Sequence, residues 1–215
     1  MITDSALPNH VGLIPDGARR WARENSYSYL YSYRKAMKLI EAFIDFMFRN
    51  QVANISVYLL SVENLKRSPE ELEIVFQAEI ELLTNLLPEI LRKYPTRIIH
   101  AGRSELLSKD YANAISSLSS LSSYSSSDSH KLYLLAGYNP FDEIRCAVGE
   151  SNIHRPLKME DLWVPTPVDL IVRTSGENRI SNFLPLQAGY AEIYFETKLL
   201  NDISEADMLE YLSWY

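Results

Sequence analysis

The sequence predicts one α/β domain over residues 1–215, with a mainly parallel central sheet flanked by helices. Three observations predict this fold class. The length suits one compact domain, short apolar runs alternate with longer segments of helical periodicity, and the apolar runs are continuous. Continuous apolar strands are typical of parallel sheets, which are covered on both faces. We therefore expect ligands beyond the carboxyl ends of the strands.

The predicted elements alternate between strand and helix along the whole chain. The expected strands are 10–14, 54–60, 97–100, 131–137, 168–172 and 190–195. The first expected helix begins after Asp16, and the others cover 34–49, 69–93, 111–123 and 141–148. Apolar residues in 34–49 recur at three and four positions, as they do on one buried helix face. Segment 69–93 opens with a proline and two glutamates, which suit the first turn of a helix. The stretch 122–129 is predicted to be a solvated connection.

Composition and charge exclude several classes of protein. The chain is 47% hydrophobic and 23% charged, as ordinary globular proteins are. Its net charge of −7 argues against a broad nucleic-acid surface or attraction to anionic lipid. No stretch approaches the roughly 20 apolar residues of a membrane span, and no basic, apolar leader opens the sequence. The single cysteine, Cys146, fits a reducing compartment. We expect a cytoplasmic protein with no nucleic-acid partner and no membrane span.

A first candidate site follows the first predicted strand. Asp16 and Gly17 form a turn, and Arg19 and Arg20 lie at the start of the next helix. Free amides at a helix start attract anions, and arginine matches phosphate oxygens. Mg²⁺ usually shares one or two carboxylates with substrate phosphates. A diphosphate with magnesium would fit here; the alternative is an ordinary Asp-Gly turn before a solvated basic helix.

A second candidate site follows strand 168–172. Arg173, Arg179 and Ser181 belong to a glycine-containing loop that suits an oxyanion, although surface arginines paired with acids would give the same pattern. Further on, Glu192 lies in an apolar segment, where a charge needs a partner or a metal. An ion pair with an arginine and metal ligation both remain open for it.

Together these segments resemble the cis-prenyltransferase family, which contains the undecaprenyl diphosphate synthases. His-Val-Gly-Leu-Ile-Pro-Asp-Gly-Ala-Arg-Arg-Trp-Ala, residues 10–22, is similar to the opening signature of that family. Residues 167–184 are similar to its closing signature, and residues 61–67 to its middle motif. The resemblance runs from residue 10 to about residue 207 and implies the cis-prenyltransferase fold.

The resemblance also implies roles for individual residues. It implies a homodimeric, Mg²⁺-dependent transferase of isoprenoid biosynthesis in which Asp16 binds magnesium and the allylic diphosphate and Glu192 is a second metal ligand. Asn64, with Ser61, would stand near the reacting carbons and assist proton removal. The expected substrate-binding residues are Gly17, Ala18, Arg19, Arg20, Trp21, Tyr33, Leu65, Arg67, Arg173, Arg179 and Ser181.

Several positions depart from the chain-elongating members of the family. Pro15 and Ala18 flank the Asp-Gly pair, the usual glycine-histidine pair falls on 32–33, and Leu65 replaces a tryptophan. The combination looks most like the atypical branch of cyclolavandulyl and lavandulyl diphosphate synthases. Those enzymes join two dimethylallyl diphosphates head-to-middle, and some then cyclise the product.

We therefore expect a prenyl diphosphate synthase that joins five-carbon allylic diphosphates into a short, irregular product and releases diphosphate. Three alternatives remain: head-to-tail elongation with isopentenyl or geranyl diphosphate, a terpene cyclase on the same fold, and a non-catalytic subunit. Either a block on a long product tunnel or ordinary core packing would explain the bulky residues Phe43, Phe46, Met47 and Phe48.

Overall fold

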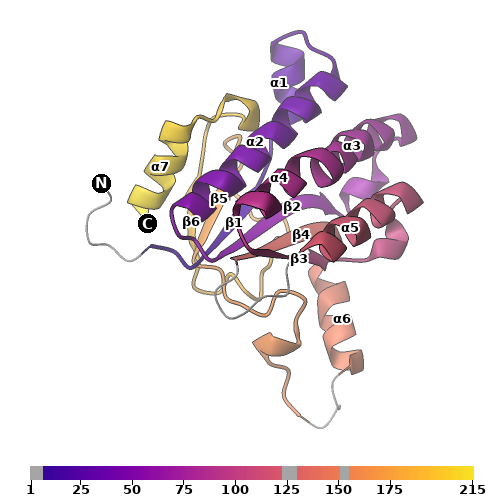
Figure 1. Ribbon diagram of the computed structural model, residues 1–215, viewed down its shortest axis with the longest axis vertical. Coiled ribbons are helices and arrows are strands. Elements are labelled where there is room, and N and C mark those ends of the chain that lie inside the picture. The colour runs from indigo at the N-terminus through magenta and orange to yellow at the C-terminus, as the bar shows by residue number, and fades with distance from the viewer. Residues whose placement is uncertain (1–6, 123–129, 151–154) are drawn as a thin grey trace.

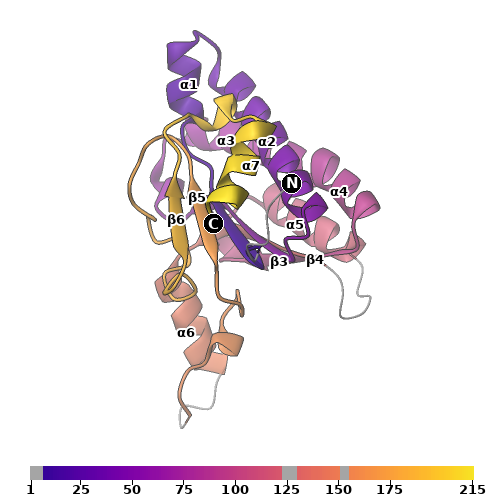
Figure 2. The same ribbon diagram turned by 90° about the vertical axis from the view of Figure 1, so that its left-hand side faces the viewer.

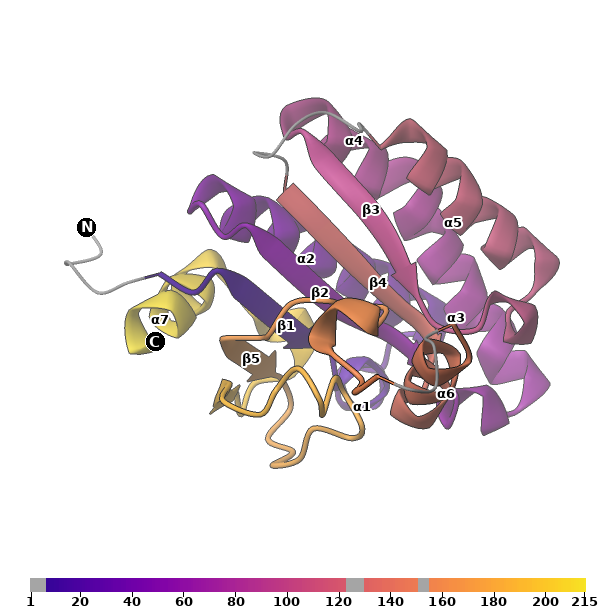
Figure 3. The same cartoon turned by 90° about the horizontal axis from the view of Figure 1, so that it is seen from below.

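A single parallel sheet organises the computed structural model, which describes residues 7–122, 130–150 and 155–215 (Figure 1). Its strands are β1 (His10–Ile14), β2 (Asn54–Ser61), β3 (Thr96–Ala101), β4 (His130–Tyr138), β5 (Leu170–Arg173) and β6 (Glu192–Phe195). The spatial order is β3-β4-β2-β1-β5-β6, and every neighbouring pair is parallel. Figure 3 shows β3, β4, β2 and β1 side by side. The predicted α/β fold class is confirmed.

The central strands are buried on both faces, as their continuous apolar character predicts. All residues of β1, β2 and β5 are buried. Successive side chains point to opposite faces, so Val57 and Leu59 of β2 join the larger core cluster, whereas Tyr58 joins the smaller one. Two apolar layers therefore hold the sheet between them.

The helices follow the predicted order with some shifted boundaries. They are α1 (Ala18–Glu24), α2 (Tyr29–Arg49), α3 (Pro69–Glu81), α4 (Leu87–Lys93), α5 (Lys109–Leu121), α6 (Pro140–Glu150) and α7 (Glu205–Trp214). Helix α2 begins five residues before the predicted start at residue 34. The reason is the cap, because the Ser28 hydroxyl accepts a hydrogen bond from the Tyr31 amide and so starts the helix earlier.

The predicted helix 69–93 is helical throughout, but it is interrupted by a π-helical turn. It begins as expected, with Ser68 capping the Glu71 amide and Pro69 in the first turn. A π-helical turn over Leu82–Leu86 then separates α3 from α4, in which Pro88 is the second residue. Proline lacks an amide hydrogen and its ring clashes with the carbonyl four residues earlier, so the helix widens ahead of it.

Most helices cover one face of the sheet. The larger core cluster packs residues of α2, α3, α4, α5 and α7 against that face. The smaller cluster on the opposite face packs the strands against residues 163–191, and α6 lies on that side in Figure 2. The flanking layers are therefore unequal, with helices on one side and mainly loop on the other.

The predicted solvated connection 122–129 lies, except for Ser122, outside the described residues.

No helix in the described part of the chain is both long enough and apolar enough to cross a bilayer.

Candidate active site

A cavity of about 450 Å³ lies where β1, β2 and β5 end, as the parallel topology predicts. Helices α2 and α3 supply its other walls through residues such as Tyr33, Met37 and Val75. Most of the predicted site residues line it, although the signatures that contain them are far apart in the sequence. These residues are Asp16, Gly17, Ala18, Arg19, Arg20, Tyr33, Ser61, Asn64, Arg67, Arg173, Arg179 and Ser181.

The Asp16 carboxylate and the Arg173 guanidinium join the two predicted clusters. Oδ2 of Asp16 accepts a hydrogen bond from Nη2 of Arg173 at 2.9 Å. Arg173 is only 4% exposed, and its Nη1 donates to the Ser181 hydroxyl and the Arg179 carbonyl. The Nε of Arg173 has no hydrogen-bond partner among the described residues. The guanidinium is thus held in a fixed orientation at the cavity wall.

The backbone around Asp16 is fastened to the loop after β5. The Asp16 amide donates to the Thr174 hydroxyl, which in turn donates to the Asp16 carbonyl. Gly17 follows with φ of 109°, and a Cβ there would lie 3.0 Å from Leu199 and 3.1 Å from Ser175. Only glycine suits this conformation and spacing. The Asp-Gly pair is therefore a close-packed turn that presents its carboxylate to the cavity.

Two arginines of the site share one carboxylate at the start of α3. Nη1 of Arg19 lies 2.8 Å from Oε1 of Glu71, and Nε of Arg67 lies 3.4 Å from the same oxygen. Nη1 of Arg67 also donates to the Tyr33 hydroxyl at 3.4 Å. Burial raises the pKa of that hydroxyl, while the Arg67 and Arg19 charges oppose the rise.

The Glu177 carboxylate likewise pairs with two other arginines of the site. Its carboxylate lies 3.4 Å from Nη1 of Arg20 and pairs with Arg179, and Nη2 of Arg20 also donates to the Ser175 hydroxyl. The alternative predicted for Arg179, pairing with acids, is therefore present, and it coexists with the place of Arg179 in the cavity wall. The side chains are partly exposed, so such pairs hold them only weakly.

The middle motif forms a tight turn at the end of β2. The Ser61 amide donates to Oδ1 of Asn64, and the Asn64 amide donates to the Ser61 hydroxyl. These reciprocal bonds leave the Nδ2 hydrogens of Asn64 for another acceptor.

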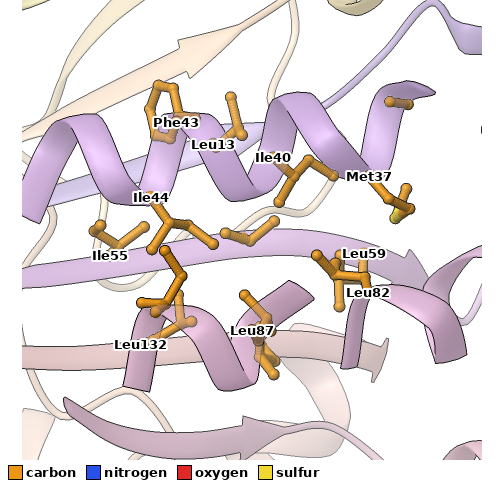
Figure 4. Packing of buried hydrophobic residues seen from close by; sticks show 14 of the residues in the cluster. Leu13, Met37, Ile40, Phe43, Ile44, Ile55, Leu59, Leu82, Leu87 and Leu132 are labelled. Atoms are coloured by element: carbon orange, nitrogen blue, oxygen red, sulfur yellow. The ribbon is translucent and has the colours of Figure 1, made fainter. Parts of the chain in front are cut away.

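The inner end of the cavity is apolar. Figure 4 shows Met37, Ile40 and Ile44 of α2 against Ile55 and Leu59 of β2. Met37, Ile40 and Leu59 line the cavity, whereas Ile44 and Ile55 belong to the packed core beyond it. The bulky residues considered as tunnel blocks all lie in that core and not on the cavity surface, namely Phe43, Phe46, Met47 and Phe48.

Glu79 is a carboxyl in this apolar wall that sequence reasoning missed. It is 3% exposed, and Tyr111 donates to its Oε2 at 2.6 Å. Burial raises its pKa to about 7, against the opposing effects of the Tyr111 hydrogen bond and the Arg67 charge. The available signal was its spacing of one helical turn from Val75. Sequence reasoning also missed two exposed or half-buried residues that line the cavity, Arg23 and Glu177.

Three predicted site residues do not line the cavity. Trp21 is buried, and its Nε1 donates to Asp202 at 2.7 Å, while Leu65 packs against the core. Glu192 is exposed and pairs with Leu170 at the amino ends of β5 and β6, away from Asp16. The fold of one chain does not bring this carboxylate to Asp16, and the role of Glu192 as a metal ligand stays a prediction.

Asp16 is the carboxylate that would hold a metal at this site. The described residues contain no group of three or more histidine, cysteine, aspartate or glutamate side chains arranged to hold an ion. Asp16 fits the way in which Mg²⁺ is commonly held, by a carboxylate together with substrate phosphates.

The comparisons with known proteins agree with this geometry. A family model described as "Putative undecaprenyl diphosphate synthase" matches residues 14–215. The chain belongs to the cis-prenyltransferase family. Among cis-prenyltransferases it is 30% identical to an isoprenyl transferase of Leptospira interrogans, over 99% of this chain and 93% of that protein. It is also 30% identical to a tritrans,polycis-undecaprenyl-diphosphate synthase (geranylgeranyl-diphosphate specific) of Pyrobaculum aerophilum, over 97% of this chain and 93% of that protein.

A solved cis-prenyltransferase structure is also similar. Lavandulyl diphosphate synthase from Lavandula x intermedia, solved in complex with dimethylallyl diphosphate, superposes with a TM-score of 0.88 at 26% identity. The match covers 97% of this chain and 95% of that one. The chain is thus an isoprenyl transferase of the cis-prenyltransferase family, with the fold that the resemblance implied.

Proposed function

We propose that this cis-prenyltransferase is an Mg²⁺-dependent synthase that joins two dimethylallyl diphosphates head-to-middle and releases diphosphate. The product would be a lavandulyl-type, ten-carbon diphosphate. The observation that carries the proposal is one cavity in which two arginine clusters face a short apolar end. The likeness to a lavandulyl diphosphate synthase bound to dimethylallyl diphosphate supports it.

The polar end of the cavity suits two diphosphate groups. Glu71 and Glu177 form ion pairs with guanidinium groups that would bind phosphate oxygens. Exposed ion pairs contribute about 0–1 kcal/mol, so diphosphate can displace them at little cost. Arg173 differs because it is buried and already oriented by Ser181. It would hold the second diphosphate without rearrangement.

Asp16 is the residue that would hold magnesium, together with substrate oxygens. When bound, the ion supplies positive charge to the departing diphosphate. The arginines of the wall supply further charge to the same oxygens in a preorganised site. Breaking the Asp16–Arg173 contact is not required, because Oδ1 of Asp16 remains available and lies 3.9 Å from Arg20.

The apolar end suits the prenyl groups. Met37, Ile40, Leu59 and Val75 offer a water-poor surface against which an allylic cation can meet a double bond. The Nδ2 hydrogens of Asn64 can donate to a diphosphate beside the reacting carbons, while Ser61 holds this amide in place. A cavity of about 450 Å³ closed by core residues favours a short product over a long chain.

One pair of incubations tests the proposal. Purified protein with magnesium receives dimethylallyl diphosphate alone, and a second sample also receives isopentenyl diphosphate; the dephosphorylated alcohols are then identified by mass spectrometry. We expect a branched or cyclic ten-carbon alcohol from the first sample. Linear products that appear only with isopentenyl diphosphate would replace the proposal with head-to-tail elongation. No turnover in either sample by a folded protein would favour a non-catalytic subunit.

The homodimer implied by the resemblance is part of the proposal. Sedimentation velocity should give twice the monomer mass, and a monomer at micromolar concentration would contradict it.

A further inference from the structure

Glu79 differs from the other carboxylates that line the cavity. Asp16 pairs with Arg173 and Glu177 pairs with Arg20, so both already serve the diphosphate end. Glu79 forms no ion pair within the described residues, and its described hydrogen bond comes from the Tyr111 hydroxyl. A buried carboxyl without a counter-ion is costly, so its presence in an apolar wall calls for a reason.

The surroundings of Glu79 leave one of its oxygens for the cavity. Oε2 accepts from Tyr111, which belongs to α5 behind the wall. The Tyr111 hydrogen bond does not involve Oε1, and Glu79 lines the cavity. Val75, one turn earlier in α3, lines the same cavity, so Glu79 lies on the helix face that borders the cavity.

Three ionisable groups face this carboxyl from the neighbouring elements. Tyr111 approaches from α5, Arg67 from the segment after β2, and Tyr33 from α2. Arg67 pairs with Glu71 and donates a hydrogen bond to the Tyr33 hydroxyl. Burial nevertheless raises the pKa of Glu79 to about 7, which is the range in which a carboxyl works best as a proton acceptor at neutral pH.

We propose that Glu79 is the catalytic base of the coupling step and that Tyr111 positions its carboxyl. This inference rests on the proposed function, since it assigns the proton that head-to-middle coupling releases. Asn64 cannot take this proton, because a neutral amide is a very weak base and its oxygen already accepts from the Ser61 amide.

The step balances with Glu79 as the acceptor. The C1–O bond of one dimethylallyl diphosphate breaks, and its electron pair leaves with diphosphate. The C2=C3 pair of the second substrate then forms the new bond to C1, which leaves a positive charge on C3. A C–H bond of a methyl group on C3 breaks, its electrons form the new double bond, and the proton passes to the Glu79 carboxylate. Solvent takes the proton after the product leaves.

The position of Glu79 matches the proton that this coupling loses. In head-to-middle coupling the proton comes from a methyl group, the part of the substrate farthest from its diphosphate. Arg173 and Glu79 line the same cavity, so with the diphosphate at Arg173 we expect that methyl group to lie toward the wall that contains Glu79. The negative charge of the Glu79 carboxylate would also face the developing cation and so favour formation of the cation in a water-poor site.

The test compares Glu79→Gln with wild type, using dimethylallyl diphosphate and magnesium. Glutamine keeps the size and an acceptor for Tyr111 but cannot take a proton. We expect kcat to fall about 100-fold or more with KM nearly unchanged. Wild-type kcat should rise with pH up to about 7 and then level, and this rise should vanish in the variant. Tyr111→Phe removes the bond that lowers the Glu79 pKa, so it should move the wild-type rise to higher pH.

Glu143→Gln is the matched control. Glu143 is also buried and accepts from a tyrosine, Tyr138, at 2.6 Å, yet it does not line the cavity. We expect this control to lower stability while it keeps the wild-type pH profile of kcat.

The outcomes separate this inference from the proposed function. If wild type is active and the kcat of Glu79→Gln is within threefold of the wild-type kcat, Glu79 is not the base and the proposed function stands. The same conclusion follows if the variant keeps the wild-type pH profile of kcat. Wild type that is folded but makes no product from dimethylallyl diphosphate overturns both. An active Glu79→Leu variant that makes longer products would replace the base with a role in limiting chain length.

Discussion

The Asp16 carboxylate accepts a hydrogen bond from the Arg173 guanidinium at 2.9 Å, although the two residues are 157 positions apart in the sequence. Both residues stand at the ends of neighbouring parallel strands, and Ile14 of β1 is in register with Arg173 of β5. The sheet therefore unites the opening and closing signatures of the family. The contact also orients the carboxylate proposed to hold magnesium.

Asp16→Asn should abolish magnesium-dependent turnover while the domain stays folded. The neutral amide can still accept from Arg173, so we expect the free energy of unfolding to fall by less than about 2 kcal/mol. Loss of the metal carboxylate removes several kcal/mol of transition-state stabilisation, which corresponds to a fall in kcat of at least about 100-fold. Steady-state kinetics and urea unfolding measure the two effects. Glu205→Gln, which breaks only the exposed Arg49–Glu205 pair, is the control, and undiminished activity of Asp16→Asn would reject the metal role.

Glu177→Gln should tighten the binding of inorganic diphosphate. The wild-type carboxylate neutralises Arg20 and Arg179 and must give way to the ligand. Removing a partly exposed ion pair of about 0.5–1 kcal/mol predicts a twofold to fivefold lower Kd. Isothermal titration calorimetry with magnesium diphosphate at two salt concentrations measures this, and the gain should shrink at high salt. Weaker binding by the variant would show that Glu177 helps to hold the ligand.

Ile40→Ala should admit a longer allylic substrate. Ile40 lines the apolar end of the cavity, and Ile44, one turn further along α2, lies in the core behind it. Ile44→Ala is the control variant. Ile40→Ala and Ile44→Ala should each lose roughly 2–5 kcal/mol of stability, because both changes remove buried side-chain carbons. Only Ile40→Ala should then accept geranyl diphosphate and give a fifteen-carbon product, as detected by mass spectrometry. Equal behaviour of the two variants would mean that Ile40 does not limit product length.

The buried His10 side chain should lower the free energy of unfolding in mild acid. Burial lowers its pKa from 6.5 to about 4, and this effect outweighs the Pro167 hydrogen bond and the Asp169 charge, which both raise the pKa. The His10 Nδ1 lies 2.9 Å from the Pro167 carbonyl oxygen, and its Nε2 lies 2.8 Å from the Ser56 hydroxyl. Below about pH 6.5 His10 is protonated in the unfolded chain but stays neutral in the folded chain. The free energy of unfolding therefore falls as the pH is lowered from about 6.5 to about 4. Between pH 7 and pH 5 this amounts to roughly 2 kcal/mol.

A His10→Gln variant isolates this contribution. Glu79 titrates with the opposite sign, because its raised pKa makes stability fall as pH rises from about 4.5 to 7. The quantity to measure is therefore the difference in unfolding free energy between wild type and variant, from urea denaturation at both pH values. We expect the wild-type advantage to shrink by about 2 kcal/mol at pH 5. A constant difference would show that His10 does not stay neutral when folded.

Local patterns in the sequence predicted most of the fold. Continuous apolar runs marked β1, β2, β4 and β5, because a strand buried on both faces has little room for polar side chains. Shorter apolar runs marked β3 and β6, which are only partly buried. The boundary errors arose where single side chains decide, as with the Ser28 cap and the helix widening before Pro88. Such effects depend on hydrogen-bond geometry that residue periodicity does not record.

Only part of the candidate site could likewise be predicted from the sequence. Asp16, Arg173 and their neighbours were predictable, because turn glycines, arginines and hydroxyls after apolar strands mark anion sites in parallel sheets. Tertiary structure alone decided that Glu79 borders the cavity and that Glu192 lies at the far end of its strand. The physical reason is that a charged residue within an apolar segment has the same sequence pattern whether it faces solvent, an arginine or a ligand. Only the packing of α3 against α5, and the register of β6 on β5, distinguish these surroundings.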